Sequence, residues 1–399
     1  MHGGPLRLDP ILTGTVRTHA TNSRVTDSAS SATAYATGVK TYNGAIGVDS
    51  SRAAVATLLE AAEAAGMATG LVATSRITHA TPASFAAHVP SRGMETEIAA
   101  QMMSKDIEVI LGGGRAMFVP QSDGGRREAG DDLIAAARAD GYAFVDTPDA
   151  LAAVTDTPLL GLFADSHLDY EVDRDPADQP SLADLTAKAL ALLQDDADGF
   201  FLVIEGSRID HAAHSNDPVG MAFDAIAFDA AVGVALDFAE RAGNTLIVST
   251  ADHETGGLTL GRDGIYAWQP LPLTQVNASL SSYLGRVMDG EAPLAAFEAI
   301  ADFDLTDEER QRLADAEGTD EAGPAYVEII SARAGLGWTT TGHTAVDVNL
   351  YAFGPGHHLF RGNVDNTAIG RRLATLLGFD LDALTEQLRR ELALGTEDN

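Results

Sequence analysis

Cysteine is absent from the 399-residue sequence, and lysine is scarce. Without cysteine, disulfide bonds and thiolate–metal sites are excluded, so any metal ion must be held by His, Asp, Glu or Ser side chains. Lysine occurs only as Lys40, Lys105 and Lys188, and every other permanently cationic side chain is arginine. No window comes near the ~18 uninterrupted apolar residues of a membrane helix, so the sequence predicts no membrane span.

Acidic residues far outnumber basic ones. The sequence has 58 Asp and Glu against 26 Lys and Arg, a formal net charge of −32. A surface with this charge repels nucleic acids and argues against a nucleic-acid partner. Abundant carboxylates with few lysines suit a halophilic protein, but a GC-rich genome also favours arginine over lysine, and both explanations stay open. An anionic substrate would need local positive charge, for which arginine and divalent metal ions are the candidate sources.

Short apolar runs, each followed by small or polar residues, recur along the chain at 70–74, 107–111, 200–204 and 245–249. Their length and two-sided apolar character are typical of buried strands in a parallel sheet. Alanine-rich helical patterns lie between them, at 53–65, 131–140 and 222–240. Strands alternating with helices predict an α/β fold: a three-layer α/β/α sandwich with a large, mostly parallel central sheet. Ligands of such sheets gather at the carboxyl ends of the strands, where polar clusters follow the apolar runs.

Residues 261–335 interrupt this alternation. Strand-like runs are few there, and acidic residues are frequent from Asp302 to Asp320. Thr306, followed by three acidic residues, is typical of a capped helix start. We interpret the chain as a single domain, 1–399, with a peripheral insertion at about 261–335. Gly112-Gly113-Gly114 lacks the lysine of a phosphate-binding loop and is predicted to form a tight turn.

Three polar segments carry candidate metal ligands. Asp210 and His214 are four residues apart, so on a helix they share one face and could hold one ion. Asp252 and His253 directly follow an apolar run, and His343 lies in a third segment. Each segment alone is more typical of a polar helix start or loop than of a metal site. Together they bring carboxylate and imidazole ligands to one sheet edge, a distribution typical of a two-metal site.

Ser28 is the candidate nucleophile. It stands among small residues at the start of an alanine-rich helical pattern. At a helix N-terminus, free N–H groups and the helix dipole favour an anion or an alkoxide. The same pattern is also typical of an ordinary Ser/Asp helix cap. No base-bearing triad partner for Ser28 is evident in the sequence, so we expect a metal ion to activate it.

In combination, these segments resemble the alkaline phosphatase family. Asp27-Ser28-Ala29 leading into ATGVKT at 36–41 resembles its nucleophile motif. The segment from Thr81 to Arg92 resembles the one that provides a magnesium ligand and the phosphate-binding arginine. The motifs occur in the family's order, and the resemblance spans about residues 13–370.

The resemblance implies two zinc ions and one magnesium ion as cofactors, and a role for each candidate residue. Ser28 would become phosphorylated, and Arg92 would bind phosphate through two guanidinium nitrogens. The implied ligands are Asp210, His214 and His343 at the first zinc, Asp252, His253 and Ser28 at the second, and Thr81 and Glu205 at the magnesium. His79 and His211 stand at positions that vary within the family. They would adjust the magnesium site, admit a third zinc, or only hydrogen-bond water around the metals.

The implied reaction is hydrolysis of small phosphate monoesters to an alcohol and inorganic phosphate. A metal-activated Ser28 would attack phosphorus in line, and water would then hydrolyse the phosphoserine. Two alternatives stay open: a phosphodiesterase or sulfatase of the same superfamily, and a non-catalytic phosphate- or metal-binding homologue. Those sibling hydrolases usually present threonine or a modified cysteine as nucleophile, so Ser28 favours the monoesterase. A homodimer and export to the periplasm or the medium are implied by the family alone.

One family feature has no counterpart upstream of Ser28. The family begins with a buried strand ending in Asp-Gly, whose aspartate bridges the second zinc and the magnesium. Asp9 is the only carboxylate before Asp27, and it follows no apolar strand. The first residues, MHGGPLRLDP, also do not form a secretory signal as they stand. We therefore expect the natural gene to start upstream of Met1, and this chain alone to lack one metal ligand.

Overall fold

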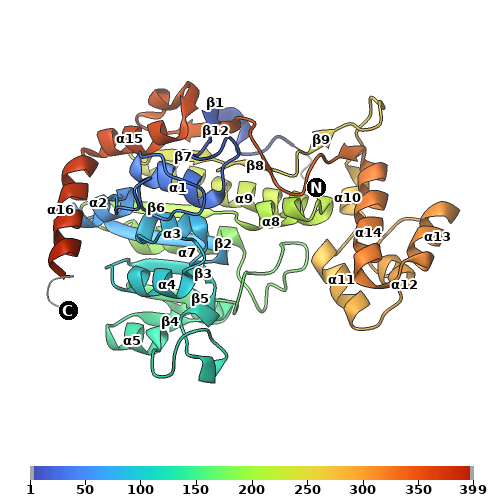
Figure 1. Ribbon diagram of the computed structural model, residues 1–399, viewed down its shortest axis with the longest axis horizontal. Helices are drawn as coiled ribbons and strands as arrows, with labels where there is room; N and C mark the ends of the chain where they lie inside the picture. The colour runs from blue at the N-terminus through green and yellow to red at the C-terminus, as the bar shows by residue number, and fades with distance from the viewer. Residues whose placement is uncertain (1–3, 396–399) are drawn as a thin grey trace.

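Two β-sheets form the centre of the molecule, and helices cover both of their faces (Figure 1). The computed structural model describes residues 4–395, so Met1 lies outside the described part. The larger sheet has five strands in the order β4-β5-β3-β2-β6, and all of its pairings are parallel. Its strands are β2 (Ala68–Arg76), β3 (Val109–Gly113), β4 (Ala143–Val145), β5 (Leu159–Leu162) and β6 (Phe200–Glu205). This parallel sheet between helical layers is the predicted α/β architecture.

The smaller sheet has the order β13-β1-β12-β7 and mixes strand directions. It consists of β1 (Leu12–Arg17), β7 (Ile247–Thr250), β12 (Val348–Phe353) and β13 (Gly362–Asp365). β12 pairs antiparallel with both β1 and β7, while β1 and β13 are parallel. The sequence did not predict β1, because its residues, LTGTVR, form no apolar run and only Val16 is buried.

The parallel sheet is buried because its strands send apolar side chains to both faces. On one face, Leu71 and Ile110 join a core with α1, α3, α4 and α5. On the other, Val72 and Val109 join a core with α7 and α9. The helices of this body are α1 (Ser28–Thr37), α2 (Leu58–Ala64), α3 (Ala80–Ala86), α4 (Glu95–Met103), α5 (Leu133–Ala139), α6 (Pro148–Ala153), α7 (Leu182–Leu193), α8 (Arg208–His214), α9 (Pro218–Ala242), α15 (Asn366–Leu377) and α16 (Leu381–Gly395).

Two local predictions were wrong in their boundaries. The helix expected at 53–65 begins only at Leu58, because Thr57 and Glu60 form a capping box: the Thr57 hydroxyl accepts from the Glu60 N–H, and the Glu60 carboxylate accepts from the Thr57 N–H. The expected turn at 112–114 is confined to Gly114, whose φ is +97°. Gly112 and Gly113 belong to β3.

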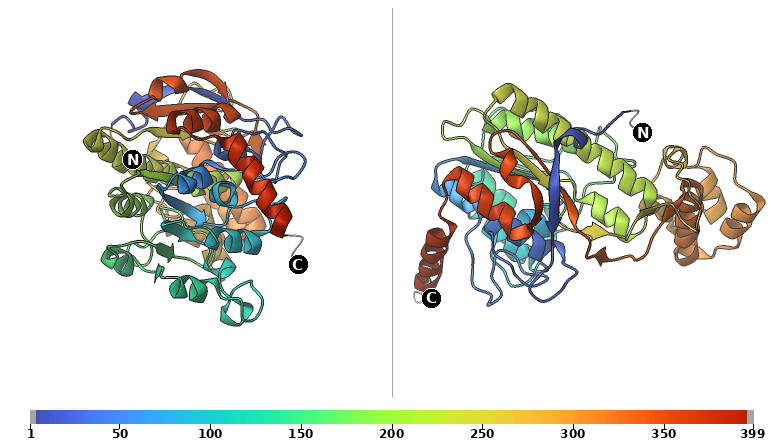
Figure 2. Two further views of the ribbon diagram at one scale, coloured as in Figure 1. Left: turned by 90° about the vertical axis from the view of Figure 1, so that its left-hand side faces the viewer. Right: turned by 90° about the horizontal axis from the view of Figure 1, so that it is seen from above.

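Residues after β7 build a helical lobe with its own core, at the opposite end of the molecule from α16 (Figure 2). Its helices are α10 (Leu271–Thr274), α11 (Leu280–Met288), α12 (Pro293–Glu298), α13 (Asp307–Asp315) and α14 (Gly318–Ala334). Tyr283, Phe297 and Tyr326 are fully buried at its centre. Thr306 caps α13 through a capping box, as predicted. The buried Asp217 joins lobe and body: it caps α9 and accepts the Leu280 N–H at 2.8 Å.

Of the helices in residues 4–395, α9 alone is long and apolar enough to cross a membrane by length and composition. It packs along α7 and α8. Two of its aspartates, Asp224 and Asp229, are buried and accept backbone N–H groups of Glu171 and Arg7. These contacts make α9 a core helix of the folded body.

β6 and β7 each lie at an edge of their sheet. In the described residues β6 pairs only with β2, and β7 pairs only with β12. Both carry apolar runs, FFLVI and IV, yet every residue of both strands is only partly buried, whereas β3 is buried throughout. Strands with this composition belong inside a sheet, so these two edges leave apolar surface and backbone N–H groups uncovered.

We expect the uncovered edges to show in hydrogen exchange. Peptides covering β6 and β7 should exchange faster than peptides covering β3, because N–H groups that lack a strand partner are protected less. Exchange followed by mass spectrometry measures this directly, with β3 as the internal control. Equal protection of β6 and β3 would show that the second edge of β6 is covered in solution.

Candidate active site

The predicted site residues meet where β6 and β7 end. β6 terminates in Glu205 and leads into α8, which carries Asp210 and His214. β7 leads into Asp252 and His253, just ahead of β8 (Glu254–Thr255). β8 pairs antiparallel with β11 (His343–Thr344), which brings in the third histidine. β9 (Thr259–Leu260) and β10 (Leu336–Gly337) form a second short ribbon beyond them.

Ser28 is the first residue of α1. Asp27 is the helix N-cap, and its carboxylate accepts the Ser30 N–H at 3.0 Å. A helix that begins at this residue directs its dipole and free N–H groups toward the site. Ser28 is buried, and its Oγ lies 3.0 Å from His253 Nε2. The resemblance implied that Ser28 and His253 share the second zinc, and in the structure the two side chains are in contact.

Asp210, His214 and His343 form the first ligand group. They offer ligand atoms that all lie within 4.8 Å of one another. Asp210 Oδ1 is 3.5 Å from His214 Nε2 and 3.7 Å from His343 Nε2, and the two Nε2 atoms are 3.0 Å apart. The predicted spacing of Asp210 and His214 on one face of α8 therefore brings both to His343.

The hydrogen bonds of this group leave its nitrogens suited to a cation. His214 Nδ1 is 2.7 Å from the Thr341 carbonyl, and His343 Nδ1 is 2.8 Å from the Thr26 carbonyl. A carbonyl oxygen only accepts, so both Nδ1 atoms carry the proton and both neutral rings present Nε2 lone pairs. Two lone pairs facing each other beside a carboxylate repel unless a proton or metal ion lies between them. The donor set therefore fits a divalent metal such as zinc.

Asp252, His253 and Ser28 form the second ligand group. His253 Nε2 lies 3.1 Å from Asp252 Oδ2 as well as 3.0 Å from Ser28 Oγ. In a Ser-His-Asp triad the carboxylate lies at the opposite ring nitrogen from the serine. Here all three atoms converge on one side of the ring, which is the arrangement of a ligand set.

The electrostatics of the second group agree with this. Desolvation opposes ionisation of Asp252, but the His253 ring and hydrogen bonds from His253 and Ser28 outweigh it and hold the pKa of that carboxyl well below its usual range. Asp252 is therefore a carboxylate at any physiological pH. Burial favours the neutral ring of His253, but the Asp252 carboxylate favours the protonated ring and outweighs burial. The pKa of His253 is therefore raised.

Glu205 lies at the end of β6 beside three hydroxyl groups. Its carboxylate accepts from Ser207 Oγ at 2.5 Å and from Ser75 Oγ at 3.5 Å, and it also hydrogen-bonds Thr81. Desolvation raises the pKa of Glu205 to about 7, since the hydroxyl bonds compensate only in part. The structure thus brings Glu205 and Thr81 together, an all-oxygen set of the kind that magnesium prefers.

Arg92 reaches the same site from the loop before α4. One guanidinium nitrogen is 3.2 Å from Asp27 Oδ2, and the other is 3.0 Å from His79 Nε2. Asp27 also accepts the Gly44 N–H at 3.0 Å, so the carboxylate that caps α1 also orients Arg92. The side chain is held beside Ser28 with its planar fork partly exposed.

His79 and His211 belong to a three-histidine cluster that includes His167. The ring centroids are 5.7 Å apart for His79 and His167, 5.2 Å for His79 and His211, and 4.4 Å for His167 and His211. Burial, with Arg76 and Arg208 nearby, lowers the pKa of His167 to about 3, and the pKa of both other rings is also lowered. Among residues 4–395, the one group of three close His, Asp or Glu ligand atoms is Asp210, His214 and His343, and it does not include these rings.

Sequence reasoning missed two residues of this site. Thr255 stands between Asp210 and His253, with its hydroxyl 2.5 Å from Asp210 Oδ1. Its place two residues after His253 in a polar segment was an available signal. His167 lies in the loop after β5, and nothing in the local sequence connects it with His79.

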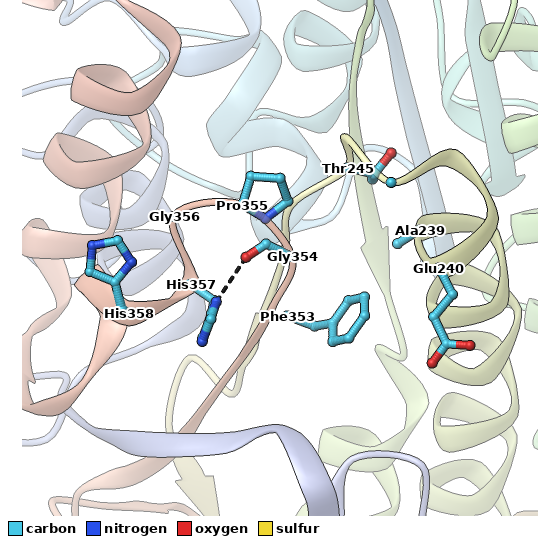
Figure 3. A pocket seen from close by; sticks show the side chains of 10 residues that line it. Ala239, Glu240, Thr245, Phe353, Gly354, Pro355, Gly356, His357 and His358 are labelled. Atoms are coloured by element: carbon cyan, nitrogen blue, oxygen red, sulfur yellow. Dashed lines mark hydrogen bonds between the residues drawn. The ribbon is translucent and has the colours of Figure 1, made fainter.

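A cavity of about 540 Å³ lies at the other end of β7. It is lined by Thr245, Phe353, Glu240, His357 and His358 among others (Figure 3). His357 Nδ1 is hydrogen-bonded to the Gly354 carbonyl at 2.9 Å, and the side chains of Glu240 and His358 point away from this hydrogen bond (Figure 3). These side chains do not converge, so the cavity offers no site comparable to the one around Ser28.

Comparison with known proteins agrees with the geometry. A family model described as alkaline phosphatase matches residues 4–379. Alkaline phosphatase 3 of Bacillus subtilis is 40% identical over 391 residues, covering 94% of this chain and 83% of that protein. The structure of a cold-active alkaline phosphatase from Shewanella sp. has a TM-score of 0.87 and 38% identity, covering 94% of this chain and 92% of that one. A histidine-to-aspartate mutant of the alkaline phosphatase from the Antarctic bacterium TAB5, with Mg bound in its M3 site, has a TM-score of 0.71 and 29% identity, covering 95% and 92%.

Proposed function

The chain belongs to the alkaline phosphatase family and is a phosphomonoester hydrolase, and from this premise we propose that its reaction passes through a phosphorylated Ser28 at a site for two zinc ions and one magnesium ion. One observation carries the proposal. Ser28 Oγ and Asp252 Oδ2 lie 3.0 and 3.1 Å from His253 Nε2, beside the first ligand group. A serine placed among metal ligands at a helix N-terminus suits nucleophilic attack on an anion.

The proposed residues divide the chemistry between them. Asp210, His214 and His343 would hold the first zinc, Asp252 and His253 with Ser28 the second, and Thr81 and Glu205 the magnesium. Bound metals would supply Lewis acidity that lowers the pKa of the attacking hydroxyl and stabilises the leaving oxygen. The magnesium in the TAB5 relative supports the third ion.

Ser28 Oγ attacks phosphorus, the P–O bond to the alcohol breaks, and the alcohol leaves with a proton. Water then attacks the phosphoserine, which releases inorganic phosphate and restores the Ser28 hydroxyl. Arg92 binds two of the phosphoryl oxygens throughout and balances the charge that develops on them. Asp27 keeps the guanidinium aimed at the site through its 3.2 Å contact.

Hydrolysis of p-nitrophenyl phosphate with and without zinc and magnesium tests the proposal. We expect turnover at alkaline pH only when both metals are supplied, since Ser28 has no separate triad base. Turnover by a fully metal-free preparation would contradict it. A homodimer and export rest on the family alone and stay predictions.

Replacing Arg92 with alanine should weaken binding of inorganic phosphate about 10- to 100-fold, the loss expected for a charge-assisted bidentate contact. Zinc content should stay near that of the unaltered chain, because Arg92 contacts none of the proposed zinc ligands. Competitive inhibition by phosphate, together with elemental analysis, measures both quantities. Arg286→Ala is the matched control, since Arg286 pairs with Glu291 in the helical lobe. Unchanged phosphate affinity in Arg92→Ala would remove Arg92 from the proposal.

A further inference from the structure

Thr255 lies between the two ligand groups and touches both. It is buried in β8, where it pairs with His343 of β11. Its Oγ1 is 2.5 Å from Asp210 Oδ1, in the first group, and 3.1 Å from His253 Nδ1, in the second. The direct approach of these two residues is longer, 4.0 Å from His253 Nδ1 to Asp210 Oδ1, so the hydroxyl is the link between them.

Counting protons fixes the direction of both hydrogen bonds. A carboxylate only accepts, so the single hydroxyl proton of Thr255 goes to Asp210. Thr255 Oγ1 can then only accept from the ring, which places a proton on Nδ1. Nε2 faces Ser28 Oγ and Asp252 Oδ2, at 3.0 and 3.1 Å. The Asp252 carboxylate also only accepts, so a metal ion bound at Nε2 would take the place of a proton shared with Asp252.

The other two histidines in the ligand groups have main-chain hydrogen-bond partners at Nδ1. His214 and His343 donate Nδ1–H to main-chain carbonyls, of Thr341 and Thr26, which no side-chain substitution removes. His253 depends on one side-chain hydroxyl. That hydroxyl also holds one oxygen of Asp210, so a single substitution reaches both ligand groups.

We propose that Thr255 is a positioning residue that orients His253 through Nδ1 and Asp210 through Oδ1, so that both metal sites of the proposed function depend on its hydroxyl. It contacts neither substrate nor the reacting atoms. Outer hydrogen bonds of this kind fix the orientation and basicity of metal-binding side chains. The inference rests on the proposed metal sites for its consequence, but the two hydrogen bonds of Thr255 are a property of the protein itself.

The first test compares zinc affinity in three variants by competition with a chelator. Thr255→Val keeps the shape and deletes the hydroxyl, and it should weaken zinc binding about 10- to 100-fold. Thr255→Ser keeps the hydroxyl and should bind within a few-fold of the unaltered chain. Thr344→Val is the matched control, because Thr344 lies on the neighbouring strand and bonds Glu254 instead of a ligand. Zinc affinity in Thr255→Val equal to that of Thr344→Val would overturn the proposal.

The second test follows the ring N–H signals of His253 in metal-free protein by nitrogen-15 NMR. The unaltered chain should show an Nδ1–H that exchanges slowly with solvent, because Thr255 Oγ1 accepts it, and Thr255→Val should lose that protection. Absence of a protected Nδ1–H in the unaltered chain would overturn the proposal even if the valine variant failed to fold. The two accounts fail separately: a chain with a protected His253 Nδ1–H that neither binds zinc nor hydrolyses phosphate esters would refute the proposed function and leave the hydrogen bond of Thr255 standing.

Discussion

Ser28→Ala should reduce hydrolysis of p-nitrophenyl phosphate by about 10⁴-fold or more, the scale of loss when a covalent nucleophile is removed. It should also abolish covalent incorporation of phosphate into the protein. The reason is geometric: Ser28 Oγ is the group that the start of α1 places against His253 Nε2, and alanine leaves no oxygen there. Initial rates and intact-protein mass spectra after reaction with substrate measure the two effects.

The matched control is Ser31→Ala, which deletes a buried hydroxyl from the same helix, outside both ligand groups. It should retain activity within about tenfold, the effect of losing one weak hydrogen bond. Zinc content measured in parallel separates a lost nucleophile from a lost metal site. A Ser28→Ala protein that still took up phosphate covalently would place the nucleophile elsewhere.

His214→Ala should lower activity by about 10³-fold, because the first ligand group supplies charge stabilisation worth several kcal/mol. The substitution leaves Asp210 and His343 with one nitrogen fewer, which is too few for a tight zinc site. We expect one zinc ion fewer per chain by elemental analysis, while the second ligand group keeps its zinc.

His357→Ala is the control for this substitution, since His357 is an exposed histidine at the far end of β7 and bonds only a carbonyl. It should change neither zinc content nor rate by more than about twofold, as is usual for surface substitutions. A His214→Ala protein with full zinc content would show that Asp210, His214 and His343 do not hold a metal together.

Much of the fold could be predicted because the strands of the parallel sheet carry their own signal. The runs at 70–74 and 107–111 are apolar on both faces and overlap the buried strands β2 and β3, since only a doubly covered strand buries such a run. β1 has no apolar run that would predict a strand. It joins its sheet through main-chain pairing with β12 and β13. The start of α2 was misplaced because alanine-rich sequence favours helix, whereas the Thr57 cap decides where it begins.

The site could be predicted in its members but not in its contacts. Asp210 and His214 share a helix face by spacing alone, so their meeting followed from sequence. That His343 would face them depends on the pairing of β8 with β11, a long-range contact that no local pattern specifies. The same limit hid Thr255 as the link from His253 to Asp210.

The family's strand ending in Asp-Gly has no counterpart in the sequence ahead of Ser28. Before Ser28 the described chain contains β1, which ends at Arg17 and lies between β12 and β13. No described strand covers the second edges of β6 and β7, the two strands that end at Glu205 and near Asp252.

The most direct test of the central claim is to map the covalent phosphoryl group. The chain is mixed with p-nitrophenyl phosphate in zinc and magnesium, quenched with acid within milliseconds, digested, and examined by mass spectrometry. The proposed mechanism predicts one phosphorylated peptide, with the phosphoryl group on Ser28, that disappears when the metals are withheld. Turnover with no phosphopeptide, or with the phosphoryl group on a different residue, would contradict the assignment of Ser28 as the nucleophile.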